Sequence, residues 1–550
     1  MKIFKTIRKR TKALILVVFV GFGALTISTD HNKYFEISKN IEIFANLYKE
    51  INTYYVDDVD PAKLMRVGID AMLESLDPYT NYISEAEMAG FRLQITGKYG
   101  GIGAGIRKID DYVVITEPYE GFPAHKAGLR AGDKILTING KSAKDKDSKE
   151  ISEVLRGAPG DEVKISIERL GEGKKDITLT REEVRIPNVP YSGMVNDNTA
   201  YIILTTFSEK AGQNVAEALE KLKKEHDVKN VILDLRGNGG GLLKEAVNVS
   251  NVFVPKNEEI VTTKGKIKEW DKSFKTLNKA VDEAIPLVVL IDGSSASASE
   301  IVSGVIQDLD RGVLVGQKTY GKGLVQNTRD VGYNSKVKLT TAKYYIPSGR
   351  CIQSVSYLDG KVVKNIDSLK TSFKTRNSRM VYDGGGVLPD LVVNNDEIGT
   401  ITQTLIRKNL VFDYATQYRQ RNNTIVPASE FSLSDADFKE FEQYVSSKDV
   451  KYETSSEKAV SDLEKKAKKD KYFDAIQAEL ENVRSKISVD KKNDLYKYKV
   501  EITKLLEREI VSRYYMQKGR IELGLKKDDE IKEAVALFNN PDRFKLLLKR

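Results

Sequence analysis

Residues that could carry out nucleophilic catalysis occur in serine- and glycine-rich turns near the middle of the chain. Ser297 lies in PLVVLIDGSSASASEIVSGVIQD, residues 286–308, which predicts a buried strand, a turn and then a helix. A serine at a helix start lies near unpaired backbone N–H groups and the positive end of the helix dipole, which favour a developing oxyanion. The structural alternative is a capping box, because Ser297-Ala-Ser-Glu300 has the required spacing.

A lysine in the next glycine-rich loop, VGQKTYGKGLVQ, is the second candidate. Lys322 lies between two glycines, and Gln326 follows four residues later. Glycine on both sides lets the backbone approach a partner closely, so the amine could enter a confined site. An exposed turn lysine is the common alternative.

A third element, Asp234-Leu-Arg-Gly-Asn-Gly-Gly-Gly241, follows the predicted strand VILDLRG and precedes a helix. Its backbone amides could hold an anion or an oxyanion. A phosphate loop is not supported, because the G-x-x-x-x-G-K-[ST] pattern is absent. A tight turn between strand and helix is the structural alternative.

Composition limits the other kinds of chemistry. The chain has a single cysteine, Cys351, and three histidines, so it can form no internal disulfide and has no zinc-binding spacing. We therefore expect no metal and no cofactor. The scattered histidines also leave little material for a Ser-His-Asp triad.

The N-terminus looks like a targeting segment. Uncharged, mostly apolar residues 13–29 follow a cationic stretch, as in a secretory signal or a membrane anchor. We expect residues 1–30 to be this segment, slightly favour an uncleaved anchor, and regard a buried core helix as the weaker interpretation. Without its six cations the net charge of +9 falls to +3, so nucleic-acid binding is not supported; these cations are Lys2, Lys5, Arg8, Lys9, Arg10 and Lys12.

The rest of the chain predicts a multidomain α+β protein. Residues 31–96 have helical periodicity, with Asp60 before Pro61 as an N-cap. Short β-type runs with one helix make residues 97–185 a compact β-rich domain. Apolar strands alternating with amphipathic helices over 186–396 predict a parallel or mixed sheet covered by helices, with Ser208 capping the first of them. Residues 397–550 are highly charged, and their pattern predicts helices.

Taken together, these motifs resemble the carboxy-terminal processing peptidases, also called tail-specific proteases. The resemblance extends over most of residues 40–395, and its specificity comes from several strings occurring in one order. These strings are Ser75-Leu-Asp-Pro-Tyr-Thr80, Leu233-Asp-Leu-Arg-x-Asn-x-Gly-Gly241, Ser295-Ala-Ser-Ala-Ser-Glu300, Tyr320-Gly-Lys-Gly-x-Val-Gln326 and Gly384-Gly-Gly-Val-Leu-Pro-Asp390.

The resemblance implies a role for each matching residue. Ser297 would be the nucleophile, Lys322 its general base and Gln326 the group that orients the lysine. Oxyanion donors would be the backbone amides of Ala298 and of Gly239 or Gly240. The catalytic core would have a crotonase- or ClpP-like fold.

The β-rich domain resembles the PDZ domain that this family carries between its helical start and its core. In PDZ domains a chain end adds as an extra strand and loop amides hold its carboxylate. That loop would here be Gly101, Ile102, Gly103 and Ala104, and Arg156 is a possible contact between the PDZ domain and the core. A purely structural β-module is the alternative.

The expected function is therefore a serine endopeptidase of the cell envelope, on the periplasmic side of the cytoplasmic membrane, anchored or secreted. Its partners would be unstructured protein substrates with accessible C-termini, and a homodimer or an adaptor is compatible with the helical C-terminal region. Two other functions stay open at this point: a non-catalytic PDZ scaffold for exported protein tails, and a binder of small apolar ligands.

Overall fold

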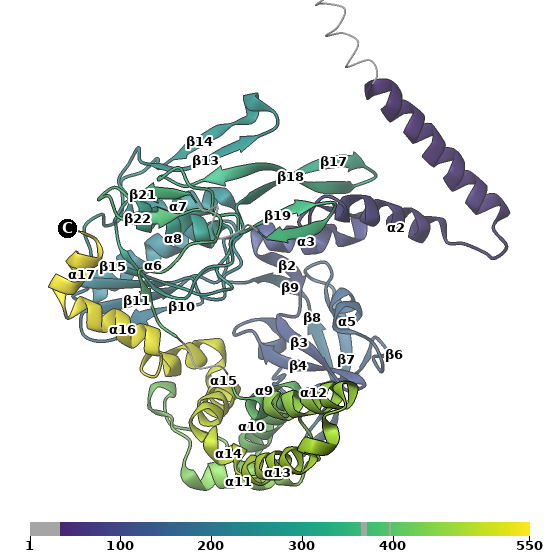
Figure 1. The fold of residues 1–550 in the computed structure, drawn as a ribbon, viewed down its shortest axis with the longest axis vertical. Coiled ribbons are helices and arrows are strands. Elements are labelled where there is room, and N and C mark those ends of the chain that lie inside the picture. Colours follow the sequence, from purple (N-terminus) through teal and green to yellow (C-terminus); the bar gives the residue numbers. More distant parts are fainter. Residues whose placement is uncertain (1–32, 365–370, 395–397, 550) are drawn as a thin grey trace, which may run out of the picture. The chain divides into compact units, whose positions relative to one another are not determined.

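The computed structural model describes residues 33–364, 371–394 and 398–549 (Figure 1). The chain forms two compact units, Met1–Tyr82 with Tyr357–Lys361, and Ile83–Ser356 with Val362–Arg550. The expected signal or anchor, residues 1–30, lies outside the described residues. Among the helices that are described, none is both long and apolar enough to cross a bilayer.

The first unit is helical, as its periodicity predicts. A helix covers residues 33–54 and α2 covers Pro61–Glu74. Asp60 caps α2 by accepting the N–H groups of Ala62 and Lys63, and Pro61 occupies the first turn. The predicted cap is therefore confirmed. Proline is tolerated there because its missing N–H would have no helical partner.

The second unit begins with α3, Met88–Thr96, and a β-rich domain. Strands of this domain form an antiparallel sheet in the order β3-β4-β5-β7-β8, and β2 pairs separately with β9. The helices are α4, Pro123–Lys126, and α5, Ser148–Leu155. The strands are β2 (Lys98–Gly101), β3 (Ala104–Ile109), β4 (Tyr112–Pro118), β5 (Lys134–Ile138), β7 (Glu162–Arg169), β8 (Gly173–Thr180) and β9 (Glu182–Arg185).

The central sheet of the core is mixed, with the order β10-β11-β12-β15-β16-β23. Strand β10 is antiparallel to β11, and every later pair is parallel. The strands are β10 (Tyr191–Met194), β11 (Thr199–Ile203), β12 (Asn230–Asp234), β15 (Leu287–Ile291), β16 (Val313–Gly316) and β23 (Leu391–Val392). Near-continuous apolar sequence suits such strands, because both faces of a parallel sheet are buried.

Helices α6, Ala211–Glu225, α7, Leu243–Phe253, and α8, Ala298–Asp308, cover one face of this sheet. The predicted cap of α6 is wrong. Lys210 occupies the N-cap position with a left-handed backbone, whereas the Ser208 hydroxyl donates to Asn188 Oδ1 at 3.0 Å. The hydroxyl that the local pattern assigned to the helix N-terminus is thus hydrogen-bonded to the buried side-chain amide of Asn188 instead.

A second group of strands lies beside the core and carries part of the candidate site. Long strands β17, Leu324–Gly332, and β18, Ser335–Tyr345, form an antiparallel hairpin, and β18 also pairs with β13, Glu259–Gly265. Strand β14, Lys272–Lys275, pairs with the other edge of β13.

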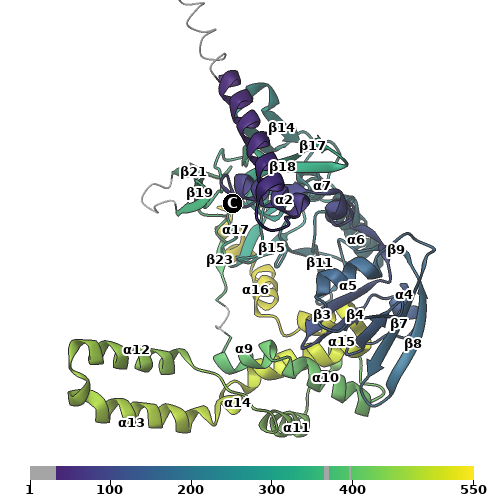
Figure 2. The ribbon, with the colours of Figure 1, turned by 90° about the vertical axis from the view of Figure 1, so that its right-hand side faces the viewer.

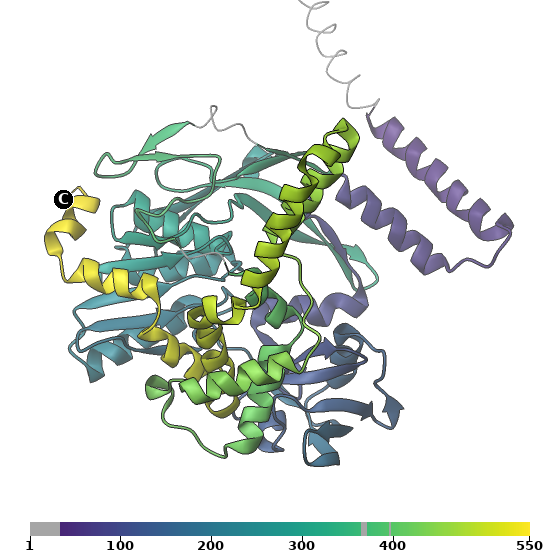
Figure 3. The same cartoon turned by 60° about the horizontal axis from the view of Figure 1, so that its bottom comes forward.

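The C-terminal region is helical, as predicted, and its helices pack in two ways. Most form a separate apolar core around α10 and α15, and the α12–α13 pair extends from it (Figure 2). The last two helices instead lie on the central sheet (Figure 3). The helices are α9 (Thr400–Arg407), α10 (Leu410–Arg421), α11 (Asp435–Ser446), α12 (Ser455–Asp470), α13 (Phe473–Lys491), α14 (Asp494–Lys497), α15 (Lys499–Leu525), α16 (Asp529–Phe538) and α17 (Pro541–Leu547).

Strand alternation explains how the sheet serves both sets of helices. Leu233 and Val289 point toward α6, α7 and α8, while Ile232 and Val288 point toward Leu537 and its neighbours in α16. Successive side chains of a strand face opposite sides, so fully apolar strands need a cover on each face. The C-terminal helices supply the second cover.

Candidate active site

Three loops that sequence analysis singled out leave the carboxyl ends of three adjacent parallel strands. The glycine loop 237–241 follows β12, the serine turn follows β15, and the lysine loop follows β16. Neighbouring parallel strands end at the same edge of a sheet, where open α/β sheets bind their ligands. The topology therefore brings the three motifs together.

Ser297 has a strained backbone. Its φ of 55° and ψ of −110° are rare for a residue with a side chain, and it is the N-cap of α8. Such a conformation costs roughly 1–3 kcal/mol and persists only where surrounding contacts hold it. Asp292 anchors the start of the turn by accepting the N–H groups of Ser294 and Ser295. Strain of this kind is common at active sites, so it supports the choice of Ser297 as a candidate nucleophile with an observation that the sequence did not supply.

The buried carboxylate of Glu300 connects this turn to the lysine loop. It accepts the Ser297 N–H at 2.8 Å, the first half of the predicted capping box. It also accepts the Gly321 N–H at 2.6 Å, the Lys322 N–H at 2.9 Å and the Thr319 hydroxyl at 2.6 Å. One carboxylate therefore binds the backbone of both residues of the proposed dyad. Glu300 can cap α8 and hold the two loops together at the same time, so the capping and catalytic interpretations are compatible.

Tyr344 of β18 makes a second connection. Its hydroxyl is within hydrogen-bond distance of the Lys322 carbonyl, at 2.7 Å, and of the Ser297 carbonyl, at 3.2 Å. Burial, with the nearby Glu300 charge, raises the pKa of Tyr344 well above its usual value, so the hydroxyl stays a donor. Neither Glu300 nor Tyr344 was predicted to join the two loops, because their partners are distant in sequence.

Lys322 lines the same cavity as Ser297, a space of about 500 Å³. The flanking glycines allow the close approach that was predicted. A Cβ on Gly321 would lie 2.5 Å from Ser354 Oγ, and one on Gly323 would lie 2.8 Å from the Gln353 nitrogen. Glycine is thus required on both sides to keep the lysine loop in place.

The glycine loop forms another wall of the cavity. Gly240 has a φ of +100°, and a Cβ there would lie 2.9 Å from the Ala298 nitrogen and 3.0 Å from Ser297 Cβ. The Gly240 N–H donates to Asn238 Oδ1 at 2.9 Å, which engages it within the loop. Of the two predicted glycines, the geometry therefore favours Gly239 as the oxyanion donor beside Ala298.

Gln326, on β17, also lines the cavity. Its side-chain amide donates to Thr340 Oγ1 at 3.2 Å, on the paired strand β18. The structure thus brings Gln326 to the site and supplies Thr340 as a partner that sequence reasoning missed. Its predicted role in orienting Lys322 stays a prediction.

The cavity has an apolar wall and no histidine among its described lining residues. Across the described chain, no group of three or more His, Cys, Asp or Glu side chains is arranged to hold a metal ion. The large apolar residues of the lining are Phe91, Ile95, Leu242, Leu243, Ile301, Leu324 and Val325.

The β-rich domain has its own groove, of about 270 Å³, between β3 and α5. Ile102 and Ala104 of the predicted carboxylate loop line it, opposite Leu155. Gly103 has a φ of +72°, and a Cβ there would lie 2.4 Å from Phe122 Cβ. Gly101, the first residue of the predicted loop, is the last residue of β2. An extended chain end could add beside β3 in this groove.

Arg156 is the C-cap residue of α5 and lines the groove. Its guanidinium lies 5.2 Å from the ring centroid of Tyr99. Burial raises the pKa of Tyr99 and of Tyr119, and the Arg156 charge opposes both shifts. Arg156 thus lies at this groove, and its predicted contact with the catalytic core stays a prediction.

Family models match three stretches of the chain. Residues 198–359 match "Peptidase family S41", residues 114–169 match "PDZ domain", and residues 401–538 match "Probable PDZ-protease, C-terminal helical domain". The first match contains Ser297, Lys322 and Gln326. The carboxylate loop precedes the PDZ match.

Curated relatives are similar over more than half of the chain. The "Carboxy-terminal processing protease CtpA" of Bacillus subtilis is 34% identical over 60% of this chain and 69% of its own length. The "Probable CtpA-like serine protease" of Staphylococcus aureus strain COL is 35% identical over 59% of this chain. Only 64% of that relative's length is covered.

Among solved structures, a photosystem II D1 C-terminal processing protease is 27% identical, with a TM-score of 0.36. The alignment covers 64% of this chain and 92% of the other.

Proposed function

Because the chain belongs to the carboxy-terminal processing proteases of peptidase family S41, we propose that it is a serine endopeptidase acting on protein tails. Its PDZ domain binds the C-terminal tail of an unstructured substrate, and its core hydrolyses a peptide bond. The observation that carries this proposal is the shared cavity of Ser297, Lys322 and Gly239 at the start of α8.

In the proposed reaction, the neutral amine of Lys322 takes the proton of the Ser297 hydroxyl as Ser297 Oγ attacks the peptide carbonyl. The N–H groups of Gly239 and Ala298 donate to the oxyanion of the tetrahedral intermediate. The protonated lysine then donates to the leaving amine, and an acyl-enzyme forms. Water, deprotonated by the same amine, attacks the ester and restores Ser297.

A lysine can act as base near neutral pH only if its pKa falls from about 10.4 to about 7, a difference of roughly 4–5 kcal/mol that burial can supply. We propose that bound substrate encloses Lys322 and excludes water from the cavity. The pH dependence of acylation tests this step. A base with an apparent pKa above about 9 would contradict a desolvated lysine.

The decisive test is incubation of a disordered protein with wild type and with Ser297→Ala. We expect loss of substrate with wild type alone, and slower loss when the substrate's C-terminal carboxylate is amidated. Equal cleavage by both proteins would refute the assigned nucleophile. Binding without cleavage by wild type would instead support a scaffold, for which no observation in the site argues.

Location and assembly are also proposals. The cationic stretch and apolar run of residues 2–29 support an extracytoplasmic protein on the periplasmic side of the cytoplasmic membrane, anchored or secreted. The helical C-terminal region is compatible with a homodimer or an adaptor. Cell fractionation and light scattering of the purified protein test these points, and a cytoplasmic monomer would contradict both.

A further inference from the structure

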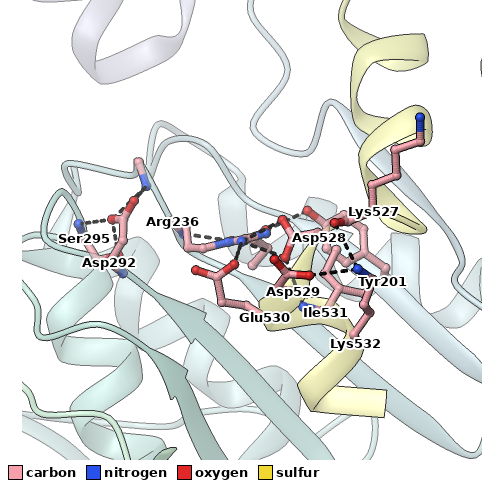
Figure 4. A network of polar contacts seen from close by, with 12 residues as sticks. Tyr201, Arg236, Asp292, Ser295, Lys527, Asp528, Asp529, Glu530, Ile531 and Lys532 are labelled. Carbon is pink, nitrogen blue, oxygen red and sulfur yellow. Dashed lines mark hydrogen bonds and ion pairs between the residues drawn. The ribbon is translucent and has the colours of Figure 1, made fainter. Parts of the chain in front are cut away.

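Arg236 joins the C-terminal region to the loop that carries the oxyanion glycine. Its side chain is 19% exposed and extends between the core and the start of α16 (Figure 4). It donates from Nη2 to Asp234 Oδ2 at 2.6 Å, and from Nη1 to Asp528 Oδ2 at 2.8 Å and Glu530 Oε2 at 3.0 Å. One guanidinium therefore holds three carboxylates, two of which belong to a region without any recognised catalytic motif.

These partners are themselves fixed. Asp234 Oδ2 accepts the Tyr201 hydroxyl at 2.7 Å, and Asp528 caps α16 by accepting the Ile531 N–H at 3.0 Å. Glu530 is 4% exposed. A short buried ion pair whose members carry further hydrogen bonds holds its geometry closely, and breaking it leaves an uncompensated charge.

From Arg236 a chain of hydrogen bonds leads to the active site. The next residue, Gly237, donates its N–H to Asp292 Oδ1 at 3.0 Å, at the base of the serine turn. Asn238 then donates its side-chain amide to the Leu204 carbonyl at 2.7 Å and accepts the Ser299 hydroxyl at 2.7 Å. Gly239 follows directly, so its position depends on the anchoring of Arg236.

We propose that Glu530 and Asp528 are positioning residues of the protease, which act through Arg236 to hold the oxyanion loop in its working geometry. The C-terminal region would thereby contribute to turnover and not only to stability. This inference rests on the proposed function, because it assigns a role in that reaction.

The test compares Glu530→Gln with Glu533→Gln. Both residues lie on α16, and Glu533 forms an exposed ion pair with Arg543 at 2.8 Å, away from Arg236. We expect Glu530→Gln to lower kcat on a peptide substrate roughly 10-fold with KM within about twofold, because small displacements of catalytic groups are costly. Glu533→Gln should behave as wild type.

Two further measurements distinguish a positioning role of Glu530 from a role in stability alone. Glu530→Asp, which keeps the charge, should recover part of kcat, and reaction with a small fluorophosphonate should slow in Glu530→Gln although it bypasses tail binding. If Glu530→Gln does not fold, Asp528→Asn takes its place with the same expected loss of kcat. An unchanged kcat, or an Asp variant no better than Gln, would overturn the proposal.

Failure of the proposed function would look different. In that case wild type itself would not cleave the peptide, whereas failure of this inference requires an active wild type and an equally active Glu530→Gln variant.

A second inference concerns the charge of the catalytic cavity. Its described lining contains two lysines, Lys322 and Lys338, and no carboxylate. Lys338 lies on β18 opposite Thr328 of β17, two residues before Thr340, so Lys338 and Thr340 share one face of the hairpin. Lys338 is half-buried. Its backbone pairs with β17, whereas its side-chain amine takes part in none of the ion pairs or hydrogen bonds of the described residues. Burial lowers its pKa, as expected for a desolvated cation without a counter-charge.

We propose that Lys338 binds a carboxylate of the substrate segment lying in the cavity, beside an apolar side chain received by the wall formed by Phe91, Ile95 and Leu242. The proposed protease would then prefer tails that combine an apolar residue with a carboxylate near the cleaved bond. The carboxylate comes either from an acidic side chain or from the free chain end, and this inference also rests on the proposed function.

Paired peptides test it. Each pair carries Glu or Gln at one position near the cleaved bond, and a further pair has a free or amidated end. We expect wild type to prefer one carboxylate roughly 10-fold in kcat/KM, as for a charge-assisted hydrogen bond. Lys338→Met should remove that preference, whereas Lys336→Met should keep it, because Lys336 pairs with Asp330 and is not part of the cavity lining.

The arms identify the source of the carboxylate. A Glu preference that depends on Lys338 indicates an acidic side chain, and an end preference that depends on Lys338 indicates the chain end. No preference in an active wild type, or one that Lys338→Met retains, would overturn the inference. A wild type that cleaves none of the peptides would refute the proposed function instead.

Discussion

The two faces of the central sheet are equally buried but differ in what their covering helices do. On one face, α7 and α8 begin at the glycine loop and the serine turn, so their N-termini border the catalytic cavity. On the other face, α16 and α17 pack on the same strands without any recognised motif. Burial is therefore a requirement of the sheet on both faces, whereas chemistry depends on which loops leave its carboxyl edge.

The largest effect should come from the motif-bearing side. Lys322→Ala removes the proposed base, and we expect kcat/KM to fall by about 10³-fold or more while the melting temperature changes little. Peptide cleavage and thermal unfolding measure the two quantities. Lys318→Ala, an exposed lysine of the same loop, is the matched control and should retain activity. Comparable activity in both variants would remove Lys322 from the reaction.

A substitution on the opposite face of the sheet should lower the stability of the protein. Leu537 of α16 is completely buried against the sheet, so Leu537→Ala should lower the free energy of unfolding by about 2–5 kcal/mol through lost burial and a cavity. Urea denaturation measures the change, and activity should be compared at equal folded fraction. A loss below about 1 kcal/mol would mean that α16 does not seal this face.

Glu300→Gln should affect both stability and activity, because Glu300 is buried and also contacts both loops of the candidate site. The amide nitrogen of glutamine would face donors that the carboxylate now accepts, and we expect kcat to fall about 100-fold together with a loss of stability. Peptide kinetics and denaturation report the two effects. Wild-type turnover in this variant would show that the shared carboxylate does not align Ser297 with Lys322.

Glu300 also predicts a pH effect on stability. Burial raises its pKa, although its hydrogen bonds oppose the shift. Between the unfolded value of about 4.3 and the raised folded value, the folded state binds more protons, so the free energy of unfolding falls as pH rises. Glu300→Gln should lose this contribution, which denaturation between about pH 4.5 and pH 7 would detect. If the free energy of unfolding depends on pH equally in wild type and in Glu300→Gln, the raised pKa of Glu300 does not contribute to stability.

The smallest effect is expected for Tyr344→Phe. Loss of one buried hydroxyl leaves the carbonyls of Ser297 and Lys322 without this donor, at a cost of about 1–2 kcal/mol in stability and roughly 5-fold in kcat. Steady-state kinetics measures the change in kcat, with Tyr345→Phe at the next position of β18 as the control. If both variants behave alike, the hydroxyl does not help to align the dyad.

Much of this architecture could be predicted from the sequence. Periodicity and turn residues located the helical start, the β-rich domain, the strand-and-helix core and the helical C-terminal region. The ordered strings around Arg236, Ser297 and Lys322 identified the family and the loops of the site. The prediction that Ser208 caps α6 was wrong. Local sequence predicts a cap only when no residue elsewhere in the fold competes for the hydroxyl, and here the side-chain amide of Asn188 accepts it.

Sequence alone determined which residue types were available for chemistry. Serine, lysine and glycine could be recognised as candidates because each lies in a turn that follows a predicted apolar strand. Tertiary structure alone decided that Glu300 serves both loops, that Tyr344 bridges them, and that Asp528 and Glu530 reach Arg236 from almost 300 positions away. The physical reason is that such contacts join elements whose separation in the chain is large, and their geometry follows from sheet order and packing, which no local pattern encodes.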